Sequence, residues 1–527
     1  LSAEKDTNRL LESILLSAKA LTHADGGTIY TVTDDATLKF EMLATDSLNI
    51  SMGGTTGNPI PFPAIPLYIN GEPNSGTIVS HAVLKGSTIN IPDVYATLDY
   101  DLSGTKAIDE NNNYHTRSLL TIPLKNHEGD IIGVLQLINA MSDGEVVEFS
   151  RVSQSIAEAL ASLAAVALTK KRLIDDMRTL FDAFTRLIAT AIDEKSPYTG
   201  GHCRRVPELT MMLTEAASNC QAGPLKDFEL DEADRYEIHV ASWLHDCGKV
   251  ATPEYVMDKA TKLETIYDRI GLVEARFEIA RRDVEIDYYK QVLEAMREDR
   301  MDDIALYDEL KRTVISSLDE QLAFIQKTNI GGEFLSEEAQ QRVADIATRT
   351  WFNREGESKP LLEDEEVANL QIARGTLNEE ERNIINNHIV VTIDMLESLP
   401  FPKHLKNVPE IAGGHHEKMD GTGYPKGLTR EQMSVPARAM AIADVFEALT
   451  AADRPYKKAK ALTECLTIMG RMRENQHIDG DLFDVFIDSG VYKKYAEEFL
   501  LPEQIDDVNL DAIIGYVPRH RRQEQIH

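Results

Sequence analysis

Histidine and aspartate side chains occur at widely separated points of this 527-residue chain, in the combination that proteins use to bind metals. His415 and His416 are adjacent and precede a turn-rich Gly-Thr-Gly-Tyr-Pro element, and His245 and Asp246 are consecutive in the stretch Trp-Leu-His-Asp-Cys-Gly-Lys. Imidazole and carboxylate groups are common ligands of transition metals. Such residues at separated points of one domain predict a site that holds more than one metal ion.

Two of the aspartates follow or lie within apolar stretches, where an unpaired carboxylate would be costly. Asp246 comes soon after Val-Ala-Ser-Trp-Leu, and Asp444 lies in the apolar helical stretch from Ala439 to Asp453. A buried negative charge needs a cation or hydrogen-bond donors close by. Side chains of consecutive helical residues diverge by about 100°. His245 and Asp246 therefore either ligate one metal together, or Asp246 bridges two metals while His245 binds one. A helix-end cap is the alternative for Asp246, but it does not account for the other motifs.

Helices are expected to position these side chains. The residues from Pro197 to Gly201 mark a break in the chain directly before a helix that begins near His202. His388 lies in a stretch with helical periodicity, and His415 and His416 follow a short apolar helix. A histidine near a helix start is held on a fixed backbone, which suits a ligand.

The composition bounds the partners that this chain can have. It carries 55 Lys and Arg against 87 Asp and Glu, a formal net charge of −32. Non-specific nucleic-acid binders present basic faces to phosphates, so this charge argues against a nucleic-acid polymer as partner. An anionic substrate requires bound cations and local Lys or Arg to reverse the field inside the site. The four cysteines lack CxxC spacing, which favours buried thiols in a reducing cytoplasm.

No stretch approaches the ~20 apolar residues that a membrane helix needs, so we expect no membrane segment within this chain. The chain begins at Leu1 rather than Met, which leaves room for an upstream segment such as a membrane anchor. We expect a cytoplasmic protein.

Residues 1–150 are predicted to form a mixed α/β domain. Helical spacing covers residues 7–22, and strand-like runs follow at 27–32, 38–44, 118–124 and 130–139. The stretches ADGGTIY and SLLTIPLKNHEGDIIGVLQLIN resemble a GAF domain, a small sensor module with helices on an antiparallel sheet. The absence of cysteine from residues 1–150 excludes thioether attachment of a bilin there, and most of the pattern typical of cyclic-nucleotide-binding members is missing.

Two long helical stretches follow this domain. Neither Pro nor Gly occurs between Glu145 and Lys195, which predicts a connecting helix over residues 151–195, paired with its twin in a homodimer. Two consecutive helices are the alternative. A second helical stretch covers residues 263–327, with a further helix over 336–351. We interpret residues 264–370 as a helical-hairpin insertion in a domain over 196–527, with a structural role, a dimer contact or an active-site lid as open alternatives.

The motifs together resemble the HD-GYP family, metal-dependent phosphodiesterases that open cyclic dinucleotides. The resemblance covers roughly the C-terminal two thirds of the chain, and several ordered motifs must coincide for it: AIDEKSPYTGGHCRRV, HDCGKV, RGTLNEEERNIINNH, HHEKMDGTGYP and IAD. It implies an all-α HD-superfamily domain, joined by the connecting helix to the GAF sensor domain. In the family, HDCGKV and RGTLNEEERNIINNH are normally much closer together, which supports the interpretation of an insertion.

The resemblance also implies a set of metal ligands around two ions. One ion would be held by His202, His245, Asp246 and Asp444, and Asp246 would bridge to a second ion held by His388, His415 and His416. Histidine-rich sites with a bridging carboxylate suit iron or manganese more than magnesium. Iron is the family expectation and manganese is the alternative.

One position departs from the pattern of some family members. They carry a glutamate four residues before the first ligand histidine, and that glutamate helps to hold a third metal. Tyr198 stands at this position here. A phenol is a poor ligand at neutral pH because its pKa is about 10, so we expect two metals.

The implied reaction is hydrolysis of cyclic di-GMP to linear pGpG, with GMP as a further product, and a mixed guanine–adenine ring such as 3′,3′-cyclic GMP–AMP is the alternative substrate. A hydroxide that bridges the two metals is expected to attack phosphorus in line, and Asp246 is expected to join the same two metals. Lys249 is expected to stabilise the phosphate in the transition state. A surface lysine near a helix end is the alternative for Lys249.

Further residues are candidate substrate contacts. Arg454 and Lys457 match family positions that contact substrate phosphates, and Arg438 is a candidate for the same surface. Tyr424 either stacks on a base or hydrogen-bonds to a phosphate. The alternative is that the loop carrying Tyr424 only braces the ligand helix or contacts a partner protein, such as a GGDEF-type signalling protein.

Two other function classes stay open. One is an HD-superfamily hydrolase that acts on nucleoside phosphates, which the stretch HHEKMDGTGYP argues against. The other is a non-catalytic receptor or scaffold that signals through the GAF domain and helices, which the complete ligand set argues against. If the chain is an enzyme, we expect the GAF domain to regulate it.

Overall fold

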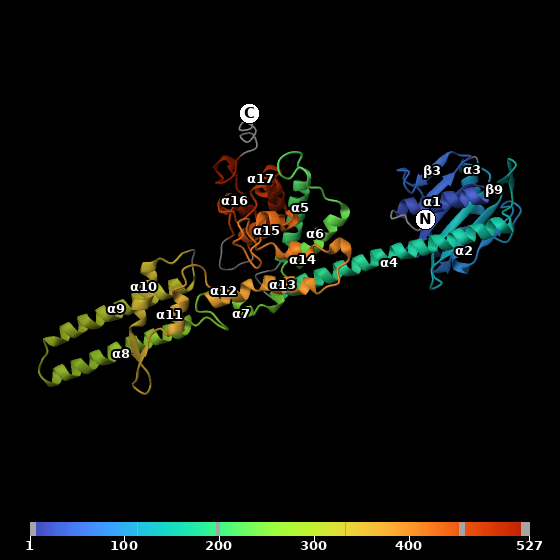
Figure 1. The fold of residues 1–527 in the computed structure, drawn as a ribbon. Coiled ribbons are helices and arrows are strands. Elements are labelled where there is room, and N and C mark those ends of the chain that lie inside the picture. The colour runs from blue at the N-terminus through green and yellow to red at the C-terminus, as the bar shows by residue number, and fades with distance from the viewer. Residues whose placement is uncertain (1–6, 113, 196–200, 332–333, 453–458, 518–527) are drawn as a thin grey trace, which may run out of the picture. The chain divides into compact units, whose positions relative to one another are not determined.

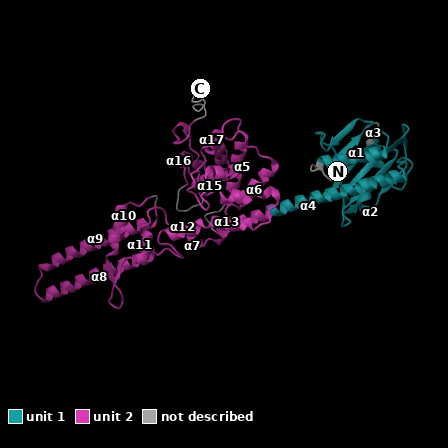
Figure 2. Cartoon of the chain, in the orientation of Figure 1, with its two compact units in different colours: residues 1–181 teal, residues 182–527 magenta. Residues whose placement is uncertain are grey.

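The computed structural model describes residues 7–112, 114–195, 201–331, 334–452 and 459–517. The chain divides into two compact units, Leu1–Phe181 and Asp182–His527 (Figures 1 and 2). Unit 1 is an antiparallel sheet with helices, a long helix follows, and unit 2 is helical with an insertion. This architecture confirms the fold class that the sequence predicts.

Unit 1 is built on an eight-stranded sheet with the main order β3-β2-β1-β9-β8-β7, in which β10 pairs with β9 and β4 with β2. All these pairings are antiparallel. The strands are β1 (Ala24–Val32), β2 (Thr37–Thr45), β3 (Ile50–Gly53), β4 (Ile65–Pro66), β7 (Ile89–Ile91), β8 (Leu119–Lys125), β9 (Ile131–Ser142) and β10 (Glu145–Val147). A separate two-stranded sheet joins β5 (Tyr68–Ile69) to β6 (Glu72–Pro73). The four strand-like runs predicted from the sequence correspond to β1, β2, β8 and β9.

Helices cover both faces of this sheet, and for that reason β8 is buried along nearly its whole length. On one face, α1 (Thr7–Thr22) and the start of α4 (Arg151–Lys195) share a core with β1, β8 and β9. On the other face, α2 (Ile78–Lys85) packs on Tyr30 and Val134. The remaining helix of this unit is α3 (Ser103–Asn112).

Helix α4 is a single helix of 45 residues, so the connecting helix predicted from the sequence is present without a break. It is also the one helix among the described residues that is long and apolar enough to cross a membrane, with a mean hydropathy of 1.4 over its most apolar window. The expectation that no stretch of the sequence is long and apolar enough for a membrane helix therefore does not hold for α4. Ala157, Ala161, Ala164 and Ala165 are buried in the core of unit 1, which gives the apolar composition of this part a packing role.

Unit 2 is helical, with helices α5 and α15 packed together near its centre. Its elements outside the insertion are α5 (His202–Ser218), α6 (Glu232–Leu244), η1 (Cys247–Ala251), α7 (Glu254–Met257), α12 (Glu379–Asn386), α13 (His388–Glu397), η2 (Lys403–Leu405), α14 (Val408–Gly413), η3 (Arg430–Gln432), α15 (Val435–Thr450), α16 (Leu462–Glu474), α17 (Gly480–Asp488), α18 (Val491–Phe499), η4 (Pro502–Gln504) and η5 (Leu510–Ala512). Local sequence sets the helix starts: Asp231 caps α6 in a capping box with Asp234, and Ser434 caps α15.

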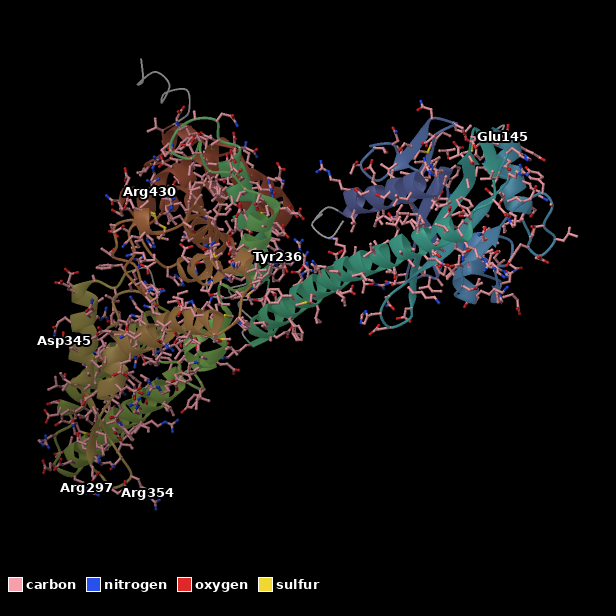
Figure 3. The ribbon with its side chains drawn as sticks, turned by 45° about the vertical axis from the view of Figure 1, so that its right-hand side comes forward. Glu145, Tyr236, Arg297, Asp345, Arg354 and Arg430 are labelled. Carbon is pink, nitrogen blue, oxygen red and sulfur yellow. The ribbon has the colours of Figure 1, made fainter. Side chains whose placement is uncertain are left out.

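The segment 264–370, predicted to be an insertion, contains a helical hairpin (Figure 1). Its buried residues form a small core. Its elements are α8 (Ile270–Arg297), α9 (Asp303–Asn329), α10 (Glu337–Ala347), β11 (Thr350–Phe352), β12 (Ser358–Pro360) and α11 (Asp364–Leu370). Val273, Phe277 and Ala280 of α8 are buried in this core. The helical stretch 263–327 is divided near Asp299, where φ is 59°, and Figure 3 labels Arg297 at the end of α8. The sequence analysis missed the β11–β12 hairpin and α11.

Candidate metal centre

The structure brings the predicted histidine and aspartate ligands together inside unit 2. Three groups of side chains could each hold an ion, because their ligand atoms lie within 4.8 Å of one another: His388, His415 and His416; His202, His245 and Asp444; and His245, Asp246 and His415. These residues come from α5, the segment after α6, the start of α13, the segment after α14, and α15. The packing of these helices thus brings together residues that lie far apart in the sequence.

Asp246 lies between two sets of histidines, and each of its oxygens faces a different set. Its Oδ2 is 3.1 Å from His202 Nε2 and 3.3 Å from His245 Nε2. Its Oδ1 is 3.3 Å from His388 Nε2 and 4.0 Å from His415 Nε2. The side chain is 2% exposed. This is the geometry of a carboxylate that bridges two cations.

Backbone carbonyl groups orient three of the histidines. The Nδ1 atoms of His245, His388 and His415 lie 2.7, 2.5 and 2.6 Å from the carbonyl oxygen of the residue three positions earlier. A carbonyl oxygen only accepts, so each Nδ1 carries the proton and donates. The lone pair of each Nε2 then points into the centre, as in metal-ligating histidines.

His202 is oriented by a carboxylate that the sequence analysis did not identify. Its Nδ1 lies 2.5 Å from Glu447 Oε2, and Arg205 lies 2.6 Å from the other oxygen of Glu447. Burial raises the pKa of Glu447, but its contacts with His202 and Arg205 outweigh burial and lower the pKa to about 2. The available signal was a second acidic residue in the apolar helix of Asp444, one turn further along.

Buried polar atoms at the centre have no partner and fit a cation. Nε2 of His245, Nε2 of His415 and Oδ1 of Asp246 have no hydrogen bond among the described residues. Burial lowers the pKa of His415 to about 4, helped by His245, and burial also puts the pKa of His416 well below its usual range. Both rings are therefore neutral and able to coordinate. Burial raises the pKa of Asp246, but Lys249 and His245 outweigh it, so this carboxyl is an anion.

A close approach of Gly248 ties the His245–Asp246 segment to α13. A Cβ at Gly248 would lie 2.0 Å from the carbonyl oxygen of His388, and the Gly248 N–H donates to Thr392 Oγ1 at 2.9 Å. Only glycine fits this contact, which fixes the spacing between the His245–Asp246 segment and His388.

Two helix boundaries lie beside residues of this centre. Helix α6 does not continue past His245; a 3-10 turn follows instead, yet Lys249 Nζ still lies 2.5 Å from Asp246 Oδ2. His388 does not lie within one long helix, because Asn387 separates α12 from α13 and His388 begins the second helix.

A cavity of about 250 Å³ opens on the centre, and Arg205, Lys249, Tyr424 and Asp444 are among its lining residues. The Tyr424 ring stacks on His416 with 4.9 Å between ring centroids. Burial and then Asp444 raise the pKa of Tyr424 to about 12, so its hydroxyl remains a donor at neutral pH. A neighbouring cavity of about 340 Å³ has His388 in its lining as well.

The loop that carries Tyr424 is folded over a buried carboxylate. Glu417, 1% exposed, accepts hydrogen bonds from the backbone N–H groups of Lys426 and Leu428 at 2.7 and 2.9 Å. A Cβ at Gly423 would lie 2.3 Å from the Lys418 nitrogen. Glu417, the residue that follows His416, thus joins the loop to the segment of His416. This role was not predicted from the sequence.

Arg438 lies in a buried ion pair rather than in the lining of either cavity. Its guanidinium contacts Asp479, whose Oδ2 also accepts from Arg430 at 2.8 Å. Burial raises the pKa of Asp479, but Arg438, the Leu482 N–H and Arg430 outweigh it, and the pKa lies below its usual value. This placement favours a structural role for Arg438.

Three other residues singled out from the sequence lie outside the described residues. They are Tyr198, Arg454 and Lys457.

Comparison with protein families identifies a GAF domain over residues 6–168 and an HD domain over residues 365–482. These matches confirm the two domain resemblances noted in the sequence. The HD match includes His388, His415, His416 and Asp444, whereas His202 and the His245–Asp246 pair precede it.

Curated relatives match parts of this chain. A 3′3′-cGAMP-specific phosphodiesterase 1 of Vibrio cholerae is 41% identical over 21% of this chain and 25% of its own length. A 3′3′-cGAMP-specific phosphodiesterase 3 of the same organism is 36% identical over 28% of this chain and 30% of its own length. A cyclic di-GMP phosphodiesterase of Pseudomonas aeruginosa is 43% identical over 16% of this chain and 20% of its own length. The aligned segments thus span about a quarter of these relatives.

Proposed function

We propose that this chain, which combines a GAF domain with an HD domain, is a metal-dependent phosphodiesterase that opens a cyclic dinucleotide. The observation that carries the proposal is the buried Asp246 carboxylate, with one oxygen toward each set of histidines and a cavity beside it. The names of the three relatives, all phosphodiesterases of cyclic dinucleotides, support the substrate class.

Two transition-metal ions would occupy this centre, iron by preference and manganese as the alternative. His202, His245, Asp246 and Asp444 would hold one ion, and Asp246, His388, His415 and His416 would hold the other. Neutral imidazoles with one bridging carboxylate support iron or manganese over magnesium. When bound, the ions supply Lewis acidity that activates water and neutralises charge on the phosphoryl oxygens.

The side chains around the centre would position the substrate and stabilise developing charge. Lys249 Nζ, close to Oδ2 of Asp246, brings a cation to the place where phosphoryl charge increases in the transition state. The protonated Tyr424 hydroxyl is a donor in the same cavity, and its ring offers a face for a base. Hydrolysis adds water across one P–O3′ bond and gives the linear dinucleotide with a 5′-phosphate.

Cyclic di-GMP is the first candidate substrate and 3′,3′-cyclic GMP–AMP is the second. The second is retained because two of the relatives are named for that ring. A panel of both rings and nucleoside triphosphates, assayed for products by chromatography, separates them from the alternative of a nucleoside-phosphate hydrolase.

Substitution of Asp246 tests the proposal. The Asp246→Ala chain, prepared anaerobically with iron or manganese, should lose both the bound metals and the hydrolysis of cyclic di-GMP. The matched control is Asp394→Ala, which removes an exposed carboxylate from α13 and should leave both unchanged. Hydrolysis that persists in Asp246→Ala would overturn the assignment, and binding without hydrolysis by the wild-type chain would indicate a receptor.

A homodimer through α4 is part of this proposal. Apolar side chains follow one another along α4 at alternating three- and four-residue steps, broken once by Lys170, and each is 55–73% exposed: Leu163, Val166, Leu173, Met177, Leu180, Phe184 and Leu187. This heptad seam is what a parallel coiled coil buries.

The seam is tested by light scattering coupled to size exclusion. Leu180→Glu is expected to convert a dimer into a monomer, whereas Thr179→Glu, on the neighbouring exposed face, should not. A wild-type monomer at micromolar concentration would contradict the dimer.

The remaining parts of the proposal concern regulation and location. The GAF domain would act on hydrolysis through α4. The described cysteines are free thiols, which supports a reducing cytoplasm. A GGDEF-type signalling partner stays a prediction.

A further inference from the structure

The last turns of α4, within unit 2, pack on the helix that leads to His245 and Asp246. Asp182 accepts a hydrogen bond from the Tyr236 hydroxyl at 2.9 Å, and the Arg186 guanidinium lies 5.7 Å from the centroid of the Trp243 ring. Figure 3 labels Tyr236 beside this part of α4. One end of the connecting helix is thereby fixed to α6, directly before the ligand pair.

Lys195, the last residue of α4, binds the segment on the other side of that pair. Its Nζ donates to the carbonyl oxygens of Lys249, Val250 and Thr252 at 3.3, 2.6 and 2.6 Å. These carbonyls lie at the end of the 3-10 turn η1, where the Thr252 N–H also donates to the Lys249 carbonyl at 3.1 Å. A cation at a helix C-terminus stabilises such carbonyls.

The neighbouring turn of α4 reaches the segment that carries His202. Oδ2 of Asp193 accepts a hydrogen bond from the Gly201 N–H at 3.2 Å, and α5 begins at the next residue, His202. Side chains from the end of α4 therefore bind the chain before and after the His245–Asp246 pair, and also the start of α5.

We infer that Lys195 is a positioning residue, which holds the backbone of residues 249–252 so that Lys249 and Asp246 keep the orientation needed for hydrolysis. This inference rests on the proposed phosphodiesterase function. Lys195 contributes to the lining of neither cavity, so it acts through the backbone and not on the substrate.

The same contacts give α4 a route to the centre. Residues 151–195 form one uninterrupted helix, so a shift of α4 along its axis moves Lys195 by the same amount. A shift of about 1 Å at a catalytic group can change a rate by about 100-fold. A signal received by the GAF domain would then change turnover without changing the ligand set.

The test compares Lys195→Met with Lys195→Arg in the full chain. Methionine keeps much of the apolar stem and removes the donors, whereas arginine keeps a charged donor. We expect Lys195→Met to lower kcat about 10- to 100-fold with little change in KM, while metal content stays at the wild-type value. Lys195→Arg should recover a large part of kcat.

Lys171→Met is the matched control, because Lys171 on the same helix pairs only with exposed Asp175 in the structure. It should leave kcat unchanged. An unchanged kcat in Lys195→Met, or a loss of metal that accounts for its whole effect, would overturn the inference.

Amide hydrogen exchange separates this inference from the proposed function. Residues 247–252 should exchange faster in Lys195→Met than in the wild type, and Lys171→Met should match the wild type. This readout does not depend on which substrate is hydrolysed. A wild-type chain that is inactive on every cyclic dinucleotide would therefore refute the proposed function but not the positioning role of Lys195. Unchanged exchange in Lys195→Met would sink the positioning role.

Discussion

Replacing Glu447 with glutamine is expected to weaken one metal position and to leave the other intact. Glu447 is 1% exposed and touches only one of the histidine ligands, His202, through its Nδ1 at 2.5 Å. Glutamine has nearly the same shape as glutamate but no charge. The substitution therefore removes the carboxylate that makes His202 a more basic metal ligand. At the second position, the rings of His388 and His415 donate to backbone carbonyls and do not depend on Glu447.

The magnitude follows from this arrangement. Loss of the carboxylate behind a metal-bound histidine typically costs 10- to 100-fold in metal affinity. That range corresponds to about 1.4–2.7 kcal/mol. Burial keeps solvent from screening the Glu447 charge, and Arg205, which is 20% exposed, loses the negative charge beside it as well. We therefore expect an effect toward the upper end of this range at the His202 position.

Titration of manganese into the metal-free full chain, followed by calorimetry, measures the two positions separately. One dissociation constant should increase 10- to 100-fold, and the other should stay the same. Glu366→Gln is the matched control, because Glu366 is also a buried carboxylate paired with an arginine, Arg276, but lies in the insertion. Equal weakening of both positions, weakening of neither, or the same effect in the control would refute the reasoning.

The remaining predictions concern the cavity, the close contact and acid stability. Lys249→Met should lower kcat about 100-fold with both metals still bound, as kinetics and metal analysis would show; loss of metal would contradict it. Gly248→Ala should lower the unfolding temperature and metal content because its Cβ would meet the His388 carbonyl at 2.0 Å, whereas Gly271→Ala, which has open space, should not. The pKa of Asp479 is lowered in the folded chain. Its ion pairs therefore stabilise the fold above the unfolded-state pKa of about 3.9. This stabilisation is lost as the pH falls through the lower pKa of the folded state. Urea unfolding from pH 7 to pH 3 should therefore show a smaller loss of stability in Asp479→Asn than in the wild type, and parallel pH curves would contradict this.

Much of the architecture could be predicted because patterns in the sequence indicate its helices and strands directly. The uninterrupted run before Lys195 predicts α4, and strand-like runs predict β1, β2, β8 and β9. Histidines and aspartates inside apolar helices indicate a shared site, because such groups are costly to bury alone. The structure brings those residues together, while their roles as ligands stay a proposal.

What the sequence could not supply depends on tertiary packing. No Gly or Pro marks the break at Asn387, which accompanies the contact of α13 with Gly248. Glu447 and Arg438 are charged residues on one apolar helix, and only the fold shows that the first orients His202 while the second pairs with Asp479. The short strands of the insertion carry too few residues for their periodicity to be recognised.

Counting bound metals in the catalytically active chain tests the central claim most directly. The full chain, purified anaerobically with iron or manganese, should contain two ions per chain by elemental analysis and should convert cyclic di-GMP to its linear form. Removal of the ions with a chelator should abolish conversion, and restoration of two ions per chain should return it. Conversion by a metal-free chain, or activity that saturates at one ion per chain, would contradict the account of paired cations joined by Asp246.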